Sequence, residues 1–383
     1  MIEQSAATSF KSPERLWQRE WVKTTGRCLR YLGIRTLVVA LTVLIGIYAA
    51  IWVTNLGGYG DAERRREIDH AVALGMVGVG TLPPEERQAV LADARQTAYA
   101  AAGLDRPFFV RSFGYWTDAL SLTLGEAAGI RSSDGSNRVI DILLERLPIT
   151  LLLFSVSSVL SFIGGLYIAL ILSRRYGTVV DRAATLLVPA FSAPPWFHGL
   201  FLIVVFASFA RVLPFGGLVD APPPGTTLGY GLSMLRHLVL PVMASILGTM
   251  PYAIYANRAL FLIHSSEDYV EMAKAKGVKP SRLRYRYVLR PVLPAIITNF
   301  ALVSIVSWQA VILTENVFNW PGLGSILILA MRADVTSGFV QETSIVVGAV
   351  TLFAYLLGVT ILFLDVFYVL VDPRVSLGSG VRR

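Results

Sequence analysis

The sequence predicts an all-α membrane protein with six membrane spans. Hydrophobic residues make up 54% of the 383 residues and charged residues only 16%, and the mean hydropathy is +0.58. The apolar residues form long uninterrupted runs, unlike the stripes of soluble amphipathic helices. Short polar, Pro-rich or basic segments separate these runs. Such alternation is typical of helices that cross lipid several times.

The N-terminal segment, residues 1–30, has basic residues about one helical turn apart, with Trp17 and Trp21 among them. This pattern predicts an amphipathic helix on the membrane surface, and a solvated tail is the alternative. The basic residues are Lys11, Arg15, Arg19, Lys23, Arg27 and Arg30. The first span is expected over residues 31–56, which at about 1.5 Å per residue can cross roughly 30 Å of hydrocarbon. It is too long for a cleaved signal peptide.

Residues 57–138 form a polar segment after the first span. Pro83 and Pro84, followed by two glutamates, predict the start of a helix that stops at Gly103. We expect a small, largely helical domain outside the membrane. A structural lid is an alternative.

Residues 139–374 contain the remaining spans, expected over 148–173, 184–213, 235–263, 295–318 and 344–371. Pro189, Pro194 and Pro195 predict a kink in the second of these, because each proline frees a backbone carbonyl. Residues 325–332 are short and apolar, which indicates a position at the outer interface. Residues 375–383 are expected to be a tail.

The orientation follows from the basic residues. All lysines lie in the N-terminal segment or in the segment 264–293. Four predicted spans separate these two segments, so they lie on one side, and the positive-inside rule makes that side the cytoplasm. Both termini are then cytoplasmic, residues 57–138 are external, and the excess of basic residues does not require nucleic acid as a partner.

The segment 264–293 is the most polar stretch between two spans. It predicts two short helices, 267–276 and 281–289. Gly277 suits a left-handed helix C-terminus, and Pro280 prevents the first helix from continuing. Tyr269 and Ala273 share one face, and small residues there permit close approach of another surface.

These residues resemble the permease subunits of binding-protein-dependent ABC importers. Glu271, Ala273 and Gly277 match the E-A-A-x-x-x-G loop by which such permeases dock on ATPase subunits, although Met272 departs from the usual alanine. The wider string D-Y-V-x-x-A-x-A-K-G resembles the dipeptide/oligopeptide branch. Further matches are L-D-R-P at 104–107, E-x-V-F-x-W-P-G-L-G at 315–324 and D-P-R at 372–374.

The resemblance implies the type I importer fold and a bacterial or archaeal cytoplasmic membrane. It also implies a second permease, two ATPase subunits or domains and an extracytoplasmic binding protein that the segment 57–138 helps to seat. The sequence has no P-loop, so ATP hydrolysis is expected in a separate subunit. The docking residues implied are Glu267, Tyr269, Glu271, Ala273, Lys274 and Gly277.

The fifth predicted span offers a candidate solute path. Ser304, Trp308, Val311 and Glu315 recur at helical spacing, with Ser307 and Gln309 beside them. A carboxylate near lipid is costly unless it is paired or hydrated, which makes Glu315 a functional candidate. The alternative is that this face packs against neighbouring helices. Asp365 is expected to pair with an arginine at a helix end.

No catalytic or metal constellation stands out, and no cofactor is expected. Cys28 is the single cysteine, and His70, His198, His237 and His264 are scattered.

Within the same branch, oligosaccharides or nickel are alternative solutes to peptides. A membrane-embedded enzyme using Glu315, Asp365 or His237, or a channel or receptor, is the alternative from another class.

Overall fold

The computed structural model describes residues 13–55, 58–75, 83–127, 129–191, 193–332 and 342–371. The expected D-P-R end and the tail 375–383 lie outside these residues. The elements are α1 (Pro13–Asn55), α2 (Tyr59–Gly75), α3 (Pro84–Ala101), α4 (Phe108–Ser121), α5 (Val139–Arg174), α6 (Val179–Ala190), α7 (Pro195–Leu202), the π-helix η2 (Ile203–Phe209), α8 (Thr227–Ser265), α9 (Asp268–Ala275), α10 (Pro280–Arg282), the π-helix η3 (Leu283–Leu289), α11 (Arg290–Val317), α12 (Leu323–Met331) and α13 (Thr343–Val371).

Long apolar helices form the body of the molecule. Among the described residues, five helical stretches are long and apolar enough to cross a membrane. They are Leu29–Asn55, Val139–Arg174, Thr227–Ser265, Pro280–Val317 and Thr343–Val371. The protein is therefore a multi-pass membrane protein with an all-helical body.

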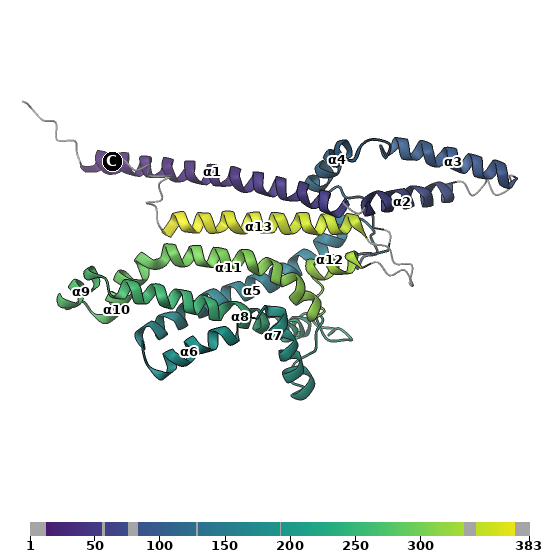
Figure 1. The fold of residues 1–383 in the computed structure, drawn as a ribbon. Helices are drawn as coiled ribbons and strands as arrows, with labels where there is room; N and C mark the ends of the chain where they lie inside the picture. The colour runs from purple at the N-terminus through teal and green to yellow at the C-terminus, as the bar shows by residue number, and fades with distance from the viewer. Residues whose placement is uncertain are drawn as a thin grey trace, which may run out of the picture.

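The two ends of this body differ (Figure 1). The start of α1 and the short helices α9 and α10 lie at one end. Helices α2, α3, α4 and α12 lie at the other. The two lysine-containing segments of the sequence are thus at the same end of the bundle, as the orientation argument requires.

The stretch expected as one kinked span over 184–213 is broken instead. Helix α6 ends at Ala190, and a new helix, α7, begins at Pro195 and continues as the π-helix η2. Pro194 and Pro195 lack the N–H groups that would bond to the preceding turn, so the helix cannot run through. At Gly248 of α8 an added Cβ would lie 2.8 Å from Pro195, which shows how closely α7 packs there.

The N-terminal segment also differs from the expectation. Helix α1 begins at Pro13 and runs without a break to Asn55, so a separate surface helix over residues 1–30 is not present among the residues described. Residues 1–12 lie outside the description. Continuity is favoured because 13–31 contains no proline after the first position and no pair of helix breakers.

The polar segment after α1 is largely helical, as predicted. Helix α3 begins at Pro84, and Gly103 has a φ of +70° just beyond its end. Helices α2 and α3 form a two-helix arm, and α3 has no buried residue. An Arg111–Asp61 ion pair of 2.7 Å fixes the base of the arm to α4. The arm therefore projects from the bundle (Figure 1).

Candidate functional site

Helix α9 ends as the sequence predicts. Gly277 has a φ of +73°, the left-handed conformation that favours glycine. The Gly277 N–H donates to the Lys274 carbonyl at 2.9 Å, and the Val278 N–H donates to the Ala273 carbonyl at 3.2 Å. This pair of bonds is a Schellman motif, which satisfies two carbonyls at the helix end. No atom lies within 4 Å of a Cβ added at Gly277, so the requirement for glycine within this chain is conformational.

One face of α9 is attached to the bundle. Val270 is fully buried in a cluster with Phe261 of α8 and with Val288 and Val292 at the start of the next long helix. Ala273, three residues on, is 5% exposed. The Ala273 side chain is therefore covered within this chain, and the contact expected between it and a partner stays a prediction.

The opposite face of α9 is free within this chain. Tyr269 is 40% exposed and Met272 57% exposed. Glu267, Glu271, Lys274 and Gly277 are exposed as well. The acidic residues are in the first turn of α9 and Lys274 is in the last, which suits the helix dipole. Partial burial, with the Glu267 carboxylate nearby, raises the pKa of Tyr269.

The second short helix predicted over 281–289 is not separate. Helix α10 passes through η3 directly into α11, so that Pro280–Val317 is one continuous apolar helical stretch. Pro291 and Pro294 both lie inside this continuous stretch, Pro291 next to the point where the π-helix η3 passes into α11. The segment carrying α9 is thus coupled directly to a membrane-crossing helix.

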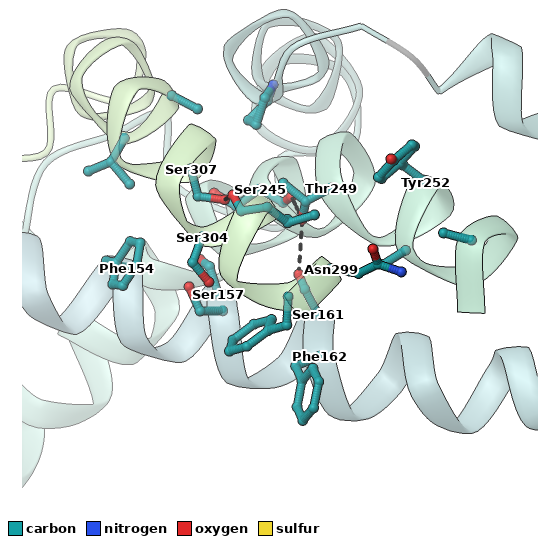
Figure 2. Close-up of a pocket in the computed structure, with 18 of the residues that line it drawn as sticks. Phe154, Ser157, Ser161, Phe162, Ser245, Thr249, Tyr252, Asn299, Ser304 and Ser307 are labelled. Atoms are coloured by element: carbon teal, nitrogen blue, oxygen red, sulfur yellow. Dashed lines mark hydrogen bonds between the residues drawn. The ribbon is translucent and has the colours of Figure 1, made fainter. Parts of the chain in front are cut away.

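A small cavity of about 40 Å³ lies between α5, α8 and α11 (Figure 2). Ser304 and Ser307 come from α11, and Val311 of the same helix also lines it. Asn299 and Phe300 of α11 line it as well. The other helices contribute the polar residues Ser157, Ser161, Ser245, Thr249, Tyr252 and Asn257, with Phe154 and Phe162 as aromatic walls. Of the lining residues that the structure describes, none is charged.

Several polar groups in the cavity wall remain available for hydrogen bonding. The Ser161 and Thr249 hydroxyls lie 3.1 Å apart across the α5–α8 interface (Figure 2). The Ser157 Oγ and Asn257 Oδ1 atoms are buried and have no hydrogen-bond partner within the described part of the chain. Buried polar groups are normally satisfied, so these atoms suit a polar solute or water in the cavity.

Only some of the residues of α11 that were predicted to line the path therefore lie at the cavity. Ser304, Ser307 and Val311 line the cavity, whereas Trp308 does not. Its ring stacks on Phe154 at 3.8 Å, and its Nε1 donates to Thr360 Oγ1 of α13 at 3.2 Å. Trp308 is thus a packing residue between α5, α11 and α13. Gln309 is exposed on the outside of the helix.

Glu315 is fully buried, but at a turn rather than in the cavity. Its Oε2 accepts hydrogen bonds from the N–H groups of Gly324 at 2.7 Å and Ser325 at 3.2 Å. Thr150 Oγ1 accepts the Leu323 N–H at 2.7 Å. The first N–H groups of α12 are thus capped from α11 and α5. In this structure Glu315 therefore stabilises the start of α12, and the role expected of it in the solute path stays a prediction.

Close packing around the Glu315 carboxyl group explains why this turn has glycine at two positions. A Cβ at Gly322 would overlap the Glu315 carboxyl group, and a Cβ at Gly324 would lie 2.5 Å from Ile312 Cα. Trp320 is fully buried and donates from Nε1 to the Ile149 carbonyl at 3.1 Å. The residues of E-x-V-F-x-W-P-G-L-G therefore hold the turn between α11 and α12.

Two ion pairs join helices near the α9 end. Asp365 accepts two hydrogen bonds from Arg35 of α1, at 3.1 and 3.2 Å, so the expected arginine partner is confirmed. Asp181 of α6 accepts from Arg258 of α8 at 2.5 and 2.6 Å.

The sequence interpretation missed the cavity residues on α5 and α8. Ser157 and Ser161, and likewise Ser245 and Thr249, are four residues apart inside apolar helices. Hydroxyl pairs at this spacing share a helix face, which is a signal that could have identified them.

Comparison with known proteins identifies relatives of this arrangement. Residues 161–377 match the family described as the binding-protein-dependent transport system inner membrane component. The match therefore includes α9, the cavity helices α8 and α11, and the turn at Glu315.

Individual relatives cover more of the chain. The di/tripeptide transport system permease protein of Pseudomonas aeruginosa is 30% identical, over 71% of this chain and 82% of its own length. The oligopeptide transport system permease protein of Bacillus subtilis is 29% identical, over 62% and 72% respectively. The dipeptide transport system permease protein of Escherichia coli is 26% identical, over 78% and 88%.

Proposed function

Because the chain belongs to the family of inner membrane components of binding-protein-dependent transport systems, we propose that it forms part of the solute path of an ATP-driven peptide importer. The observation that carries this proposal is the connection between α9 and the cavity. One continuous helical stretch, Pro280–Val317, packs against α9 at its beginning and lines the cavity with Ser304 and Ser307 further along.

The proposed direction of transport follows from the positions of the charges. The α9 end, with the lysines, is on the cytoplasmic side, and the arm of α2 and α3 is external. Helix α6 together with α7 and η2 provides a broken crossing, which brings the number of spans to six. Both termini are then cytoplasmic. A break between α6 and α7 is acceptable in a membrane where protein covers it, and Pro195, the first residue of α7, borders the cavity.

The proposed complex contains a second permease, two ATPase subunits and an external binding protein. The exposed face of α9, with Glu267, Tyr269, Glu271, Lys274 and Gly277, docks on an ATPase subunit. The buried face, through Val270, transmits the movement of that subunit to α8 and α11. A change in the tilt of α11 then alters the cavity between α5, α8 and α11. Rigid attachment of α9 is essential, since a loose loop would not transmit force.

Peptides are the proposed solute because the relatives are named for di/tripeptide, oligopeptide and dipeptide transport. The cavity supports a path with weak binding. Hydroxyl, amide and aromatic groups offer hydrogen bonds and contact area without fixed charges that would retain a zwitterion. The binding protein, and not this cavity, then selects the solute.

The test is ATP-dependent uptake of a radiolabelled dipeptide into proteoliposomes that contain the whole complex. Gly277→Val forces a β-branched residue into the left-handed region at a cost of about 1–2 kcal/mol or more, whereas Gly277→Asn tolerates that region. We expect Gly277→Val to retain ATP hydrolysis with little uptake, and Gly277→Asn to retain both. Normal uptake by Gly277→Val would contradict the role given to α9.

A further inference from the structure

Helix α4 lies beside apolar parts of α1 and α13. Trp116 Nε1 donates to the Leu44 carbonyl at 3.0 Å, and Tyr355 of α13 donates to the Leu120 carbonyl at 2.7 Å. At about 1.5 Å per residue, Leu44 is about 16 Å from the end of α1 at Asn55, and Tyr355 is about 18 Å from the start of α13. The end of α4 is therefore well inside the apolar length of both helices.

The outward face of α4 is apolar. Phe109, Val110 and Phe113 are 58%, 53% and 47% exposed. The Phe113 ring lies 5.5 Å from the ring of Tyr48 in α1, and Ile45, one turn away on α1, is 67% exposed. The apolar surface of α4 thus continues directly into that of a membrane-crossing helix.

Two polar side chains near the start of α4 are paired within the protein. Arg111, the one basic residue of the helix, forms a bidentate pair with Asp61 at 2.7 and 2.8 Å. The Ser112 and Tyr48 hydroxyls lie 3.0 Å apart. A helix in water would not require this degree of internal pairing.

The end of α4 is also satisfied internally. The carbonyls of Asp118, Ala119 and Leu120 accept hydrogen bonds from the Thr123 N–H, the Leu122 N–H and the Tyr355 hydroxyl. These are three of the carbonyls that a helix end normally leaves to water. Residues 123–126, which leave α4, line a cavity of about 430 Å³ whose wall also includes Arg64 and Asp118. Irregular backbone at membrane depth occurs where it borders such a polar cavity.

From these contacts we infer that α4 is a re-entrant helix immersed in the half of the bilayer opposite α9, with lipid acyl chains covering Phe109, Val110 and Phe113. The segment between α1 and α5 is then partly inside the membrane. The Arg111–Asp61 pair ties the base of the α2–α3 arm to a lipid-embedded helix, which fixes the arm relative to the membrane surface.

The test is the accessibility of a nitroxide label in proteoliposomes of the full-length chain with its co-purifying subunits. The background is Cys28→Ser, with the cysteines of the other subunits replaced. Labels are attached at Phe113→Cys in α4, at Ile45→Cys as the lipid reference and at Gln96→Cys on the arm as the water reference. Collision with oxygen, which enters hydrocarbon, is compared with collision with a water-soluble nickel chelate.

We expect the oxygen-to-nickel collision ratio at Phe113→Cys to match that at Ile45→Cys and to be several-fold above that at Gln96→Cys. A ratio equal to that at Gln96→Cys would place α4 in water and overturn the inference. Low collision with both reagents would mean that protein covers this face, which also overturns it. Phe109→Cys, one turn away on the same face, replaces Phe113→Cys if that variant does not fold.

Discussion

The turn between α11 and α12 permits a quantitative test of the Glu315 cap. Replacing Glu315 by leucine leaves the N–H groups of Gly324 and Ser325 buried without their acceptor. Each unsatisfied buried donor costs about 1–3 kcal/mol, so the free energy of unfolding should fall by about 2–6 kcal/mol. Glu315→Gln keeps an acceptor oxygen and should cost about 1 kcal/mol, since only the charge on the hydrogen bond is lost.

Alanine substitutions at the nearby glycines distinguish the effect of this cap on stability from the effect of close packing in general. The three atoms nearest to a Cβ added at Gly322 all belong to the Glu315 carboxyl group, so the overpacking cost of Gly322→Ala, about 1–3 kcal/mol, should largely disappear in a Glu315→Ala background. Gly324→Ala also meets Ile312 Cα at 2.5 Å, and backbone cannot move aside, so its cost should persist. Gly225→Ala, with no atom within 4 Å of the new Cβ, is the matched control.

The assay is unfolding by sodium dodecyl sulfate in mixed micelles, followed by pulse proteolysis. It gives a free energy of unfolding for each variant and for the double variants. Equal costs of Gly322→Ala in the Glu315 and Glu315→Ala backgrounds would refute the cap. Equal stability of Gly225→Ala and Gly324→Ala would refute the close approach of α12 to α11.

Three further predictions concern charges and the cavity. Arg35→Ala should cost about 3 kcal/mol in the same unfolding assay, because Asp365 is left nearly buried without its cation, and Asp365→Asn should recover part of that loss. Asp181→Asn should likewise lower the free energy of unfolding by about 3 kcal/mol in that assay, because the nearly buried Arg258 loses its carboxylate partner. Asn257→Leu should fill the cavity and lower uptake in proteoliposomes while ATP hydrolysis continues, and unchanged uptake would separate this cavity from the path.

Two helix boundaries could be predicted correctly from the sequence. Gly277 followed by Pro280 predicts the left-handed end of α9, and Pro83 with Pro84 predicts the start of α3, because both depend on residues close in the chain. Asp365 was expected to need a cation, since an isolated carboxylate in lipid is costly. Its partner, Arg35, could not be identified because the pairing of α1 with α13 is set by packing.

The different surroundings of the predicted path residues on α11 could not be predicted from their spacing in the sequence. Ser304, Trp308, Val311 and Glu315 share a helix face, but a face is covered by different neighbours along its length. Ser304 and Val311 meet the cavity, Trp308 meets Phe154 and Thr360, and Glu315 meets the turn at Gly322. Helical periodicity identifies which side chains point the same way, and tertiary contacts determine what each of them does.

The break between α6 and α7 and the fusion of η3 with α11 show a second limit of prediction from sequence. Prolines mark both places, yet one helix stops and the other continues. Pro194 and Pro195 follow each other and meet the close packing at Gly248, whereas Pro291 and Pro294 are both accommodated within the continuous stretch Pro280–Val317. The outcome depends on which neighbours satisfy the freed carbonyls.

Photo-cross-linking from α9 tests the central claim most directly. In the Cys28→Ser background, Met272→Cys places a thiol on the exposed face of α9, and Leu228→Cys, 75% exposed at the opposite end of α8, is the control. Each thiol is labelled with benzophenone maleimide, which forms a bond to a neighbouring protein on illumination. In inside-out membrane vesicles, labelled Met272→Cys should cross-link to a nucleotide-binding subunit, and labelled Leu228→Cys should not. Labelling of Met272→Cys from the external side of intact cells, with no cross-linked ATPase, would contradict the account.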